Sequence, residues 1–422
     1  MTSTDGASDT DREYDLILFG ASSFVGRLTA EYLAGAAPDG MKIALAGRSR
    51  AKLEKVRVGL PVPADQWPIV LADSGDEKSL SEMARSTRVL VTTVGPYLKY
   101  GLPLVHACAE AGTDYADLTG EVLFVRRSID SAHEIAEKKG TRIVHSCGFD
   151  SIPSDLSVLA LSDAVKAAGA GDLEETTLTV TAMRGGFSGG TIDSMKVQLD
   201  EGRANRESKR LAADPYALSP DRSQDPEPRS EPDVTGISRD SDTGAWLAPF
   251  VMATYNTRIV RRSNALTGRS YGEDFRYQEV MSAGQGPAGA VKAAGILASL
   301  GALVQGLSFT PTRKVLDRLL PDPGQGPSAD KREKGFFRMV TKTKTSSGRR
   351  FSCRVEADGD PGYKATAVML GESGLCLALD RNDLPAAAGV LTPATAMGEA
   401  LTTRLRAAGH TYDVTETSGS RA

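Results

Sequence analysis

A short apolar run that leads directly into a glycine-bounded turn constrains the fold of this chain more than any other feature. The run reads DLILF, the turn that follows it reads GASSFVG, and apolar residues then recur at helical spacing. Gly20 permits the tight turn, and Gly26 lets the helix pack closely on the strand. This strand–turn–helix arrangement predicts the first unit of a Rossmann-type dinucleotide-binding domain.

The same turn supplies a binding site for a pyrophosphate. The backbone N–H groups of Ser22, Ser23 and Phe24 lie at the start of the predicted helix, where N–H groups without intrahelical partners bind anions. Ser23 stands where the usual pattern has its middle glycine, and its small side chain still lets a diphosphate approach. We therefore expect Gly20, Ser22, Ser23, Phe24 and Gly26 to bind the cofactor.

Short apolar runs alternate with amphipathic stretches over the first third of the chain. Continuous apolar runs bounded by Gly, Pro or Asp are typical of strands buried on both faces, and their alternation with helices indicates a parallel, doubly wound sheet. We predict an α/β fold with a Rossmann domain over residues 14–150, preceded by a disordered polar tail over residues 1–13. The runs are DLILFG, KIALAG, WPIVLAD, RVLVTTVG, TDYADL and TRIVHSC.

The end of the second predicted strand distinguishes NADP from NAD. Arg48 follows Gly26 by 22 residues, close to the interval of about 20 at which NAD enzymes carry an acidic residue. A guanidinium with a neighbouring hydroxyl suits a ribose 2′-phosphate. We predict NADP(H) as the cofactor, bound by Arg48 and Ser49, with a solvated loop charge as the alternative role of Arg48.

Two later strand ends extend the predicted cofactor site. Asp73 closes the third strand, and we expect it on the adenine side of the dinucleotide. Gly95, Pro96 and Tyr97 follow the fourth strand and should run along the cofactor toward the nicotinamide.

The pattern then changes to that of an α+β domain with a largely antiparallel sheet, which we place at residues 151–390. The segments TTLTVTAMR, TRIVRRS, FRYQEVMS and RRFSCRVEAD read as strands, several of them alternating polar and apolar residues. Residues 215–244 are rich in Pro, Ser, Asp, Glu and Arg and predict a mobile loop that buries little. Residues 391–422 predict a capped helix followed by a tail.

Residues 289–309 predict an apolar helix in which Lys292 is the only charge. The uncharged part is short of the roughly 20 residues that a membrane span needs. A buried helix or a homodimer interface is one interpretation. An element that binds a lipid chain or touches a bilayer surface is the other.

Composition and charge exclude several classes of partner. The net charge is −4, which gives no support to a nucleic-acid partner, because such a partner needs a basic face. Four cysteines and four histidines lack ligand spacing, so we predict neither a metal site nor a disulfide framework. The first dozen residues lack the apolar core of a secretory signal, which predicts a cytoplasmic protein.

Two polar clusters follow the fifth and sixth predicted strands. They read DLTGE, beginning at Asp117, and HSCGFDSIPSD, ending at Asp155. Because ligands bind at the carboxyl ends of strands in doubly wound sheets, we expect the clusters to share a site. The alternative is that these carboxylates only cap helices.

Segments distributed over nearly the whole chain carry a resemblance to a known family. They are GASSFVG, ALAGRS, VTTVGPY, YGLPLVHACAEAGTDYADLTGE, HSCGFDSIPSDL, FSGGT, NTRIVRRSNAL, DGDPGYKAT and GVLTPATAMG. Together they resemble the saccharopine dehydrogenase-like oxidoreductases, and within them the mycobacterial trans-acting enoyl reductases. The resemblance implies an NADPH-dependent reductase of long lipid or polyketide-derived intermediates of cell-envelope glycolipids, with a polyketide synthase as partner. Eukaryotic members found with membranes or lipid droplets imply a peripheral contact at the inner face of the plasma membrane.

The expected reaction is hydride transfer from NADPH to the β-carbon of an α,β-unsaturated thioester or ketone. A donor near the carbonyl stabilises the enolate, and the α-carbon then takes a proton. Our candidate donors are Tyr97 first, Asp150 with Ser151 second, and His145 third; for each, a purely structural role stays open. The resemblance itself assigns no catalytic residue.

Two other functions stay open at this point. A saccharopine-type dehydrogenase acting on a small amino or imino acid needs a polar substrate pocket. A non-catalytic NADP-binding scaffold that presents a lipid to a synthase needs no turnover. The apolar helix favours the enoyl reductase or the scaffold over the amino-acid enzyme.

Overall fold

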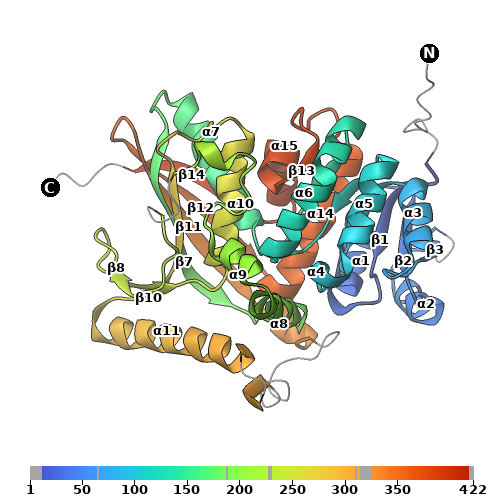
Figure 1. Cartoon of the computed structure of the whole chain (residues 1–422), viewed down its shortest axis with the longest axis horizontal. Coiled ribbons are helices and arrows are strands. Elements are labelled where there is room, and N and C mark those ends of the chain that lie inside the picture. The colour runs from blue at the N-terminus through green and yellow to red at the C-terminus, as the bar shows by residue number, and fades with distance from the viewer. Residues whose placement is uncertain are drawn as a thin grey trace.

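Two seven-stranded sheets lie side by side in the molecule, with helices around and between them (Figure 1). This computed structural model describes residues 12–63, 66–186, 189–226, 231–308, 311–313 and 326–417. Most of the predicted tail, residues 1–11, lies outside the described residues.

The first sheet is wholly parallel, which confirms the doubly wound prediction. From edge to edge its strands are β13 (Gly389–Leu391), β6 (Arg142–Val144), β5 (Asp114–Ala116), β4 (Thr87–Thr92), β1 (Tyr14–Phe19), β2 (Ile43–Gly47) and β3 (Ile69–Leu71). The helices packed with it are α1 (Phe24–Ala36), α2 (Arg50–Val58), α3 (Glu77–Ser86), α4 (Tyr97–Tyr100), α5 (Leu102–Ala111), α6 (Val122–Lys139) and α14 (Thr366–Leu379).

Both faces of this sheet are covered because successive residues of a strand point to opposite sides. Leu16 and Leu18 of β1 pack in the core with α1, α2 and α14. Ile17 and Phe19 pack in the core with α3, α5 and α6. The continuous apolar run of β1 is therefore the sequence that a strand between two helical layers requires.

The second sheet is largely antiparallel, which confirms the α+β prediction. Its strands are β14 (Thr411–Thr417), β12 (Arg350–Asp358), β11 (Phe336–Thr345), β7 (Leu173–Arg184), β10 (Arg276–Gly284), β9 (Trp246–Pro249) and β8 (Ser238–Arg239), and β7 pairs with β10 in parallel. The remaining elements are α7 (Ile152–Ala167), α8 (Gly189–Ala204), α9 (Arg206–Ala213), η2 (Arg222–Gln224), α10 (Ala253–Leu266), α11 (Gly286–Ser308), α13 (Ala329–Glu333), the π-helical turn η4 (Pro361–Ala365) and α15 (Pro393–Ala407).

The C-terminal part of the chain returns to both sheets, which changes the predicted domain boundaries. Helix α14 packs on β1 and β4 so closely that a Cβ at Gly374 would lie 2.7 Å from the Val91 side chain. Strand β13 then pairs with β6, and β14 pairs with β12. The predicted tail after the last helix is therefore wrong for residues 411–417, because an open edge of the second sheet pairs them as a strand.

The segment TRIVRRS, which we predicted to be a strand, is the middle of helix α10. Its arginines are buried with partners. Arg262 donates hydrogen bonds of 2.6 Å to the carbonyl oxygens of Leu218 and Val390, and Arg261 pairs with Glu231 at 3.0 Å. Because these contacts satisfy the charges, tertiary structure overrides the β-branched composition of the segment.

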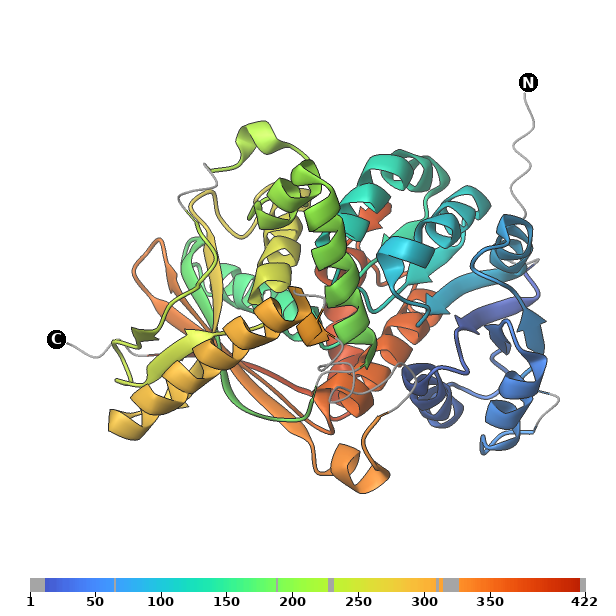
Figure 2. The same cartoon turned by 60° about the horizontal axis from the view of Figure 1, so that its bottom comes forward.

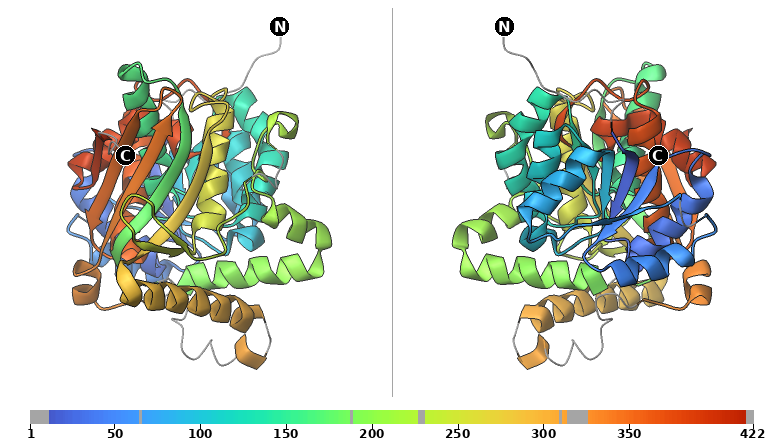
Figure 3. Two further views of the ribbon diagram at one scale, coloured as in Figure 1. Left: turned by 90° about the vertical axis from the view of Figure 1, so that its left-hand side faces the viewer. Right: turned by 90° about the vertical axis from the view of Figure 1, so that its right-hand side faces the viewer.

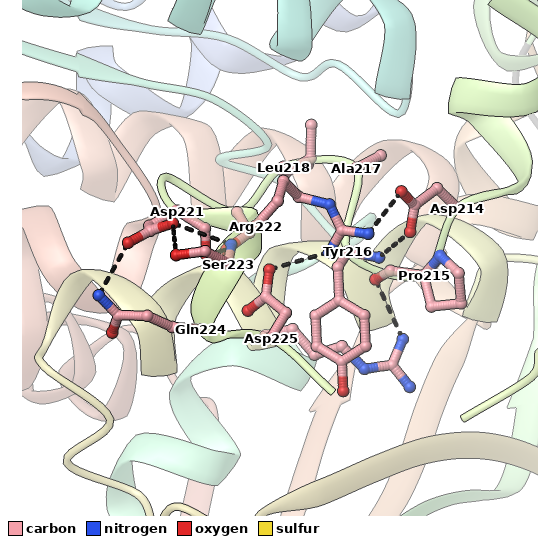
Figure 4. A network of polar contacts seen from close by, with 12 residues as sticks. Asp214, Pro215, Tyr216, Ala217, Leu218, Asp221, Arg222, Ser223, Gln224 and Asp225 are labelled. Carbon is pink, nitrogen blue, oxygen red and sulfur yellow. Dashed lines mark hydrogen bonds and ion pairs between the residues drawn. The ribbon is translucent and has the colours of Figure 1, made fainter. Parts of the chain in front are cut away.

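Residues 215–219, at the start of the predicted loop 215–244, are buried against α10, whereas more than half of the other described residues of the loop are exposed. Tyr216 is buried, and Arg222 bridges Asp214 and Asp225 at 2.8 and 2.9 Å (Figure 4). The prediction that this segment buries little holds for most of its described residues and is wrong for 215–219, whose carbonyl oxygens accept hydrogen bonds from arginines of α10. Its predicted mobility stays a prediction.

Helix α11 lies along the lower edge of the second sheet, beside α8 (Figures 2 and 3). Its 23 residues include only three that are buried, Gly289, Ala293 and Leu307, so the interpretation as a buried helix is wrong. Small residues let one face approach the sheet, and the other face is left exposed. Among the described residues α11 is the one helix long and apolar enough to cross a membrane, a criterion that core helices of soluble proteins also meet.

Candidate active site

A cavity of about 1090 Å³ lies where the two sheets meet, large for a small-molecule site. Its wall joins the loops after β1 and β4 to α8, α9, the start of α10, η4 and the C-terminal half of α11. Most of the lining residues are apolar or glycine. The charged ones are Asp150, Asp193, Arg203, Arg206 and Lys209. The described chain contains no group of three or more side chains suited to hold a metal ion.

The turn between β1 and α1 has the geometry that a dinucleotide requires. Gly20 adopts a left-handed φ of 85°, and a Cβ at Gly26 would lie 2.2 Å from the Gly20 carbonyl oxygen. Ser23 caps α1 by accepting a hydrogen bond of 2.9 Å from the Gly26 N–H. Within the described chain the N–H groups of Phe24 and Val25 donate to no acceptor, so the helix presents free donors beside the cavity. Such donors fit a pyrophosphate.

The end of β2 fits a 2′-phosphate. Arg48 is exposed and has no ion-pair partner in the described chain. Ser49 precedes α2, and its hydroxyl makes no capping hydrogen bond. Asp73, after β3, accepts a hydrogen bond of 2.9 Å from the Gly75 N–H and so shapes its own loop. Ser22 lies in the α1 turn outside the cavity wall.

The loop after β4 brings Gly95, Pro96 and Tyr97 to the cavity. The Tyr97 hydroxyl is already engaged: it donates to the Thr92 carbonyl oxygen and accepts from the Leu118 N–H, both at 3.2 Å. Burial raises the pKa of this hydroxyl further. The geometry favours the packing role for Tyr97 over its role as first candidate donor.

Asp150 lies in the cavity wall, in the loop after β6. No other residue of the described chain donates a hydrogen bond to its carboxylate. Burial, and then the nearby Asp117 carboxylate, raise the pKa of Asp150 to about 7. A carboxyl group that is half protonated near neutral pH and faces a cavity can donate a proton to a ligand.

His145 belongs to a closed network behind the cavity. Its Nδ1 hydrogen-bonds to Asp117 at 2.7 Å and its Nε2 to Ser128 at 2.8 Å. Asp117 also accepts hydrogen bonds from the Tyr115 hydroxyl and from two backbone N–H groups. The two predicted polar clusters do meet, but neither His145 nor Asp117 reaches the cavity wall.

Ser151 and Asp155 also act inside the protein. Ser151 is buried and donates a hydrogen bond of 3.1 Å to Asn256. Asp155 accepts hydrogen bonds from Ser263 at 2.5 Å and from the Ala394 N–H at 2.8 Å. These contacts join α7 to α10 and α15, and they place both residues away from the cavity.

The sequence reasoning missed two tyrosines of the cavity. Tyr255 extends from α10, where its hydroxyl hydrogen-bonds to Ser146. Tyr363 extends from η4 and packs edge-on against Phe24, with ring centroids 5.1 Å apart. No sequence signal pointed to Tyr255, because its neighbourhood was read as a strand. Tyr363 lies in DGDPGYKAT, which contributed only to the resemblance.

Comparison with known proteins defines the class. Residues 16–144 match the family model of the saccharopine dehydrogenase NADP-binding domain. Yeast saccharopine dehydrogenase (L-Glu forming) has the same fold, with a TM-score of 0.54 and 13% identity over 96% of this chain and 100% of that chain. Together with the relatives below, the match shows an NADP(H)-dependent oxidoreductase.

Closer relatives give the family. A Mycobacterium tuberculosis protein with the provisional name trans-acting enoyl reductase is 51% identical, covering 96% of this chain and 98% of its own length. The trans-acting enoyl reductase of Mycobacterium bovis is 44% identical, with 97% and 100% covered. This chain belongs to the trans-acting enoyl reductases, a branch of the saccharopine dehydrogenase-like family.

Proposed function

We propose that this protein reduces the C=C bond of a long lipid or polyketide-derived thioester, and that it acts in trans for a polyketide synthase in cell-envelope glycolipid biosynthesis. The cavity is the observation that carries this proposal. It begins at the nucleotide-binding turn, contains the carboxyl group of Asp150, whose pKa is about 7, and extends to the apolar helix α11. The names of the relatives support the same reaction.

The cofactor assignment follows the strand ends of the first sheet. The N–H groups at the start of α1 bind the pyrophosphate, and Arg48 with Ser49 binds the 2′-phosphate. Gly95 and Pro96 lie along the nicotinamide half, and Asp73 lies on the adenine side. When bound, NADPH supplies a hydride to the β-carbon of the substrate.

Asp150 completes the reduction as proton donor. As the β-carbon gains its new C–H bond, the electron pair of the C=C bond moves toward the thioester carbonyl. Asp150 then transfers its proton to the α-carbon and becomes a carboxylate. A pKa of about 7 keeps part of the protein population ready for this step at neutral pH. The apolar wall keeps water from competing.

Helix α11 gives the cavity its preference for an apolar substrate. Leu300, Leu303, Val304 and Leu307 of this helix line the wall, where an acyl chain can pack. A small amino acid needs charged partners close to the nicotinamide, yet the cationic side chains of the wall all lie on α8 and α9. This distribution disfavours a saccharopine-type substrate. The exposed face of α11 fits a peripheral contact with the inner face of the plasma membrane.

The test is NADPH oxidation by the full chain with enoyl thioesters of increasing length. We expect a saturated product, faster turnover of long chains, and little turnover with NADH. Leu303→Trp should shift the preference to shorter chains by narrowing the cavity. Val291→Trp, at a position on α11 that is 74% exposed and outside the wall, is the matched control and should not shift it. NADPH binding without consumption of any thioester contradicts the proposal and favours the scaffold.

A further inference from the structure

Three cations line one end of the cavity without partners of their own. Arg203 ends α8, and Arg206 and Lys209 lie on α9, all three exposed at the mouth. None of them forms an ion pair within the described chain. They are the only cationic side chains in the described wall, which is otherwise mainly apolar.

The acidic neighbours of this group have other partners, although the charge of Arg203 also helps to lower the pKa of Asp200. Asp200 accepts two hydrogen bonds of 2.8 Å from Arg313. Glu201 pairs with Arg127 of α6 and accepts a hydrogen bond of 3.3 Å from Ser208 of α9. Asp193, the one acid of α8 in the wall, pairs with Lys196 at 3.1 Å. Glu207 of α9 lies outside the wall.

The turn between α8 and α9 holds the cations together. The two helices lie close together there, since a Cβ at Gly202 would be in ordinary van der Waals contact with the Lys209 backbone, 3.8 Å away. Figure 3 shows α8 running along the edge of the molecule beside α11, with α9 turning back from its outer end. The cluster therefore borders the apolar wall that α11 provides.

The cluster is remote from the nucleotide-binding turn. Helix α8 begins beside η4, whose Tyr363 contacts Phe24 of α1. Arg203 lies 14 residues further along the helix than Gly189, which corresponds to about 20 Å. The cofactor's phosphates have their own donors in the first sheet, so these three cations are available to a different anion.

We propose that Arg203, Arg206 and Lys209 bind a phosphate ester carried by the acyl substrate. This inference rests on the proposed function and adds to it the head group of the substrate. An apolar chain along α11 and a phosphate at the α8–α9 turn orient the molecule, so that its unsaturated bond enters toward Asp150. Two sources share this chemistry, the pantetheine phosphate of an acyl thioester and the headgroup of a phospholipid.

The experiment compares two enoyl thioesters that differ by one phosphate, enoyl-phosphopantetheine and enoyl-pantetheine. In the variant R203Q/R206Q/K209Q we expect the KM for the first to rise about tenfold, the size of a lost charge-assisted contact, and the KM for the second to stay unchanged. An unchanged kcat in the triple variant would show that the substitutions weaken substrate binding and leave the chemical step intact. Arg210→Gln, on α9 but outside the wall, is the matched control. An equal rise for both thioesters overturns the proposal.

Calorimetry with the saturated analogues tests the site without turnover. Tighter binding of acyl-phosphopantetheine, lost in the triple variant, supports the site even if no thioester is reduced, so the two proposals can fail separately. Co-sedimentation with phosphatidylglycerol vesicles shows whether the bound phosphate comes from a lipid headgroup. Vesicle binding that the triple variant loses, with equal affinity for both thioesters, overturns the assignment to a substrate phosphate and gives the site to a lipid headgroup instead. Equal affinity for both and unchanged vesicle binding overturn it.

Discussion

Two aspartates at the carboxyl ends of neighbouring strands differ in their hydrogen bonding. One is buried behind the cavity and has partners, and the other faces the cavity and has none among the other described residues. Asp117 is fully buried and accepts hydrogen bonds from two side chains and two backbone N–H groups. Asp150 faces the cavity and accepts none from other described residues. A buried polar group that the fold satisfies stabilises the fold, whereas one left unsatisfied is available to a ligand. The structural candidates differ from the catalytic ones in whether the fold supplies their hydrogen-bond partners, and not in residue type.

The largest effect should follow from Asp150→Asn. If Asp150 donates the proton, the variant should lower kcat by about 10²–10⁴-fold, the usual contribution of a general acid, and leave the NADPH dissociation constant unchanged. The wild-type rate should fall as pH rises above about 7, because the donor deprotonates. Stopped-flow measurement of NADPH oxidation checks both points. A loss below about tenfold would return the role to another group of the cavity, such as Tyr255.

The other side of the comparison predicts a loss of stability. Asp117→Ala leaves His145, Tyr115 and two backbone N–H groups without their acceptor. We expect the free energy of unfolding to fall by about 3–5 kcal/mol, as when one partner of a buried pair is removed. Urea unfolding measures it, with Asp150→Ala as the control, which should show no loss because no other described residue donates a hydrogen bond to that carboxylate. Equal losses in the two variants would erase the distinction between the regions.

A smaller effect is expected at Arg48, which the fold also leaves without a partner. Arg48→Ala should weaken NADPH binding about tenfold and leave NADH binding unchanged, because only the 2′-phosphate contact is lost. Arg50→Ala is the matched control, since Arg50 is exposed nearby and pairs with Glu54 at 4.0 Å. Fluorescence titration with each nucleotide gives the result. If Arg48→Ala weakened the binding of both NADPH and NADH, the substitution would have disturbed the nucleotide-binding turn between β1 and α1.

The smallest effect concerns stability and pH. The pKa of Asp150 in the folded state, about 7, lies above its ordinary value, so the folded protein loses stability as pH rises from about 4 through 7. Asp150→Asn removes that loss. Its Tm should match the wild type below pH 4 and exceed it at pH 8 by roughly 5 °C. A lower Tm for the variant at pH 8 would mean that the carboxylate has a stabilising partner.

The parts predicted well from sequence were local. The turn at Gly20 and Gly26 carries its requirement in neighbouring residues, and the alternation of runs revealed the parallel sheet. Distant partners decided the rest. Arg262 lies in a helix because the carbonyl oxygens of Leu218 and Val390 accept its hydrogen bonds. The residues near TRIVRRS in the sequence give no sign of these distant partners. The cavity around Asp150 is closed by α8, α10 and α11, so only the assembled structure distinguishes it from the buried His145.

Because the C-terminal part of the chain completes the first sheet, this sheet cannot form fully during translation. When residues 14–144 have emerged, the nascent sheet lacks the helix at Thr366–Leu379 that covers one face and the strand at Gly389–Leu391 that closes one edge. Apolar surface and unpaired backbone stay open while more than half of the chain is still to be translated. We therefore expect the nascent chain to depend on chaperones until this helix and this strand have been synthesised.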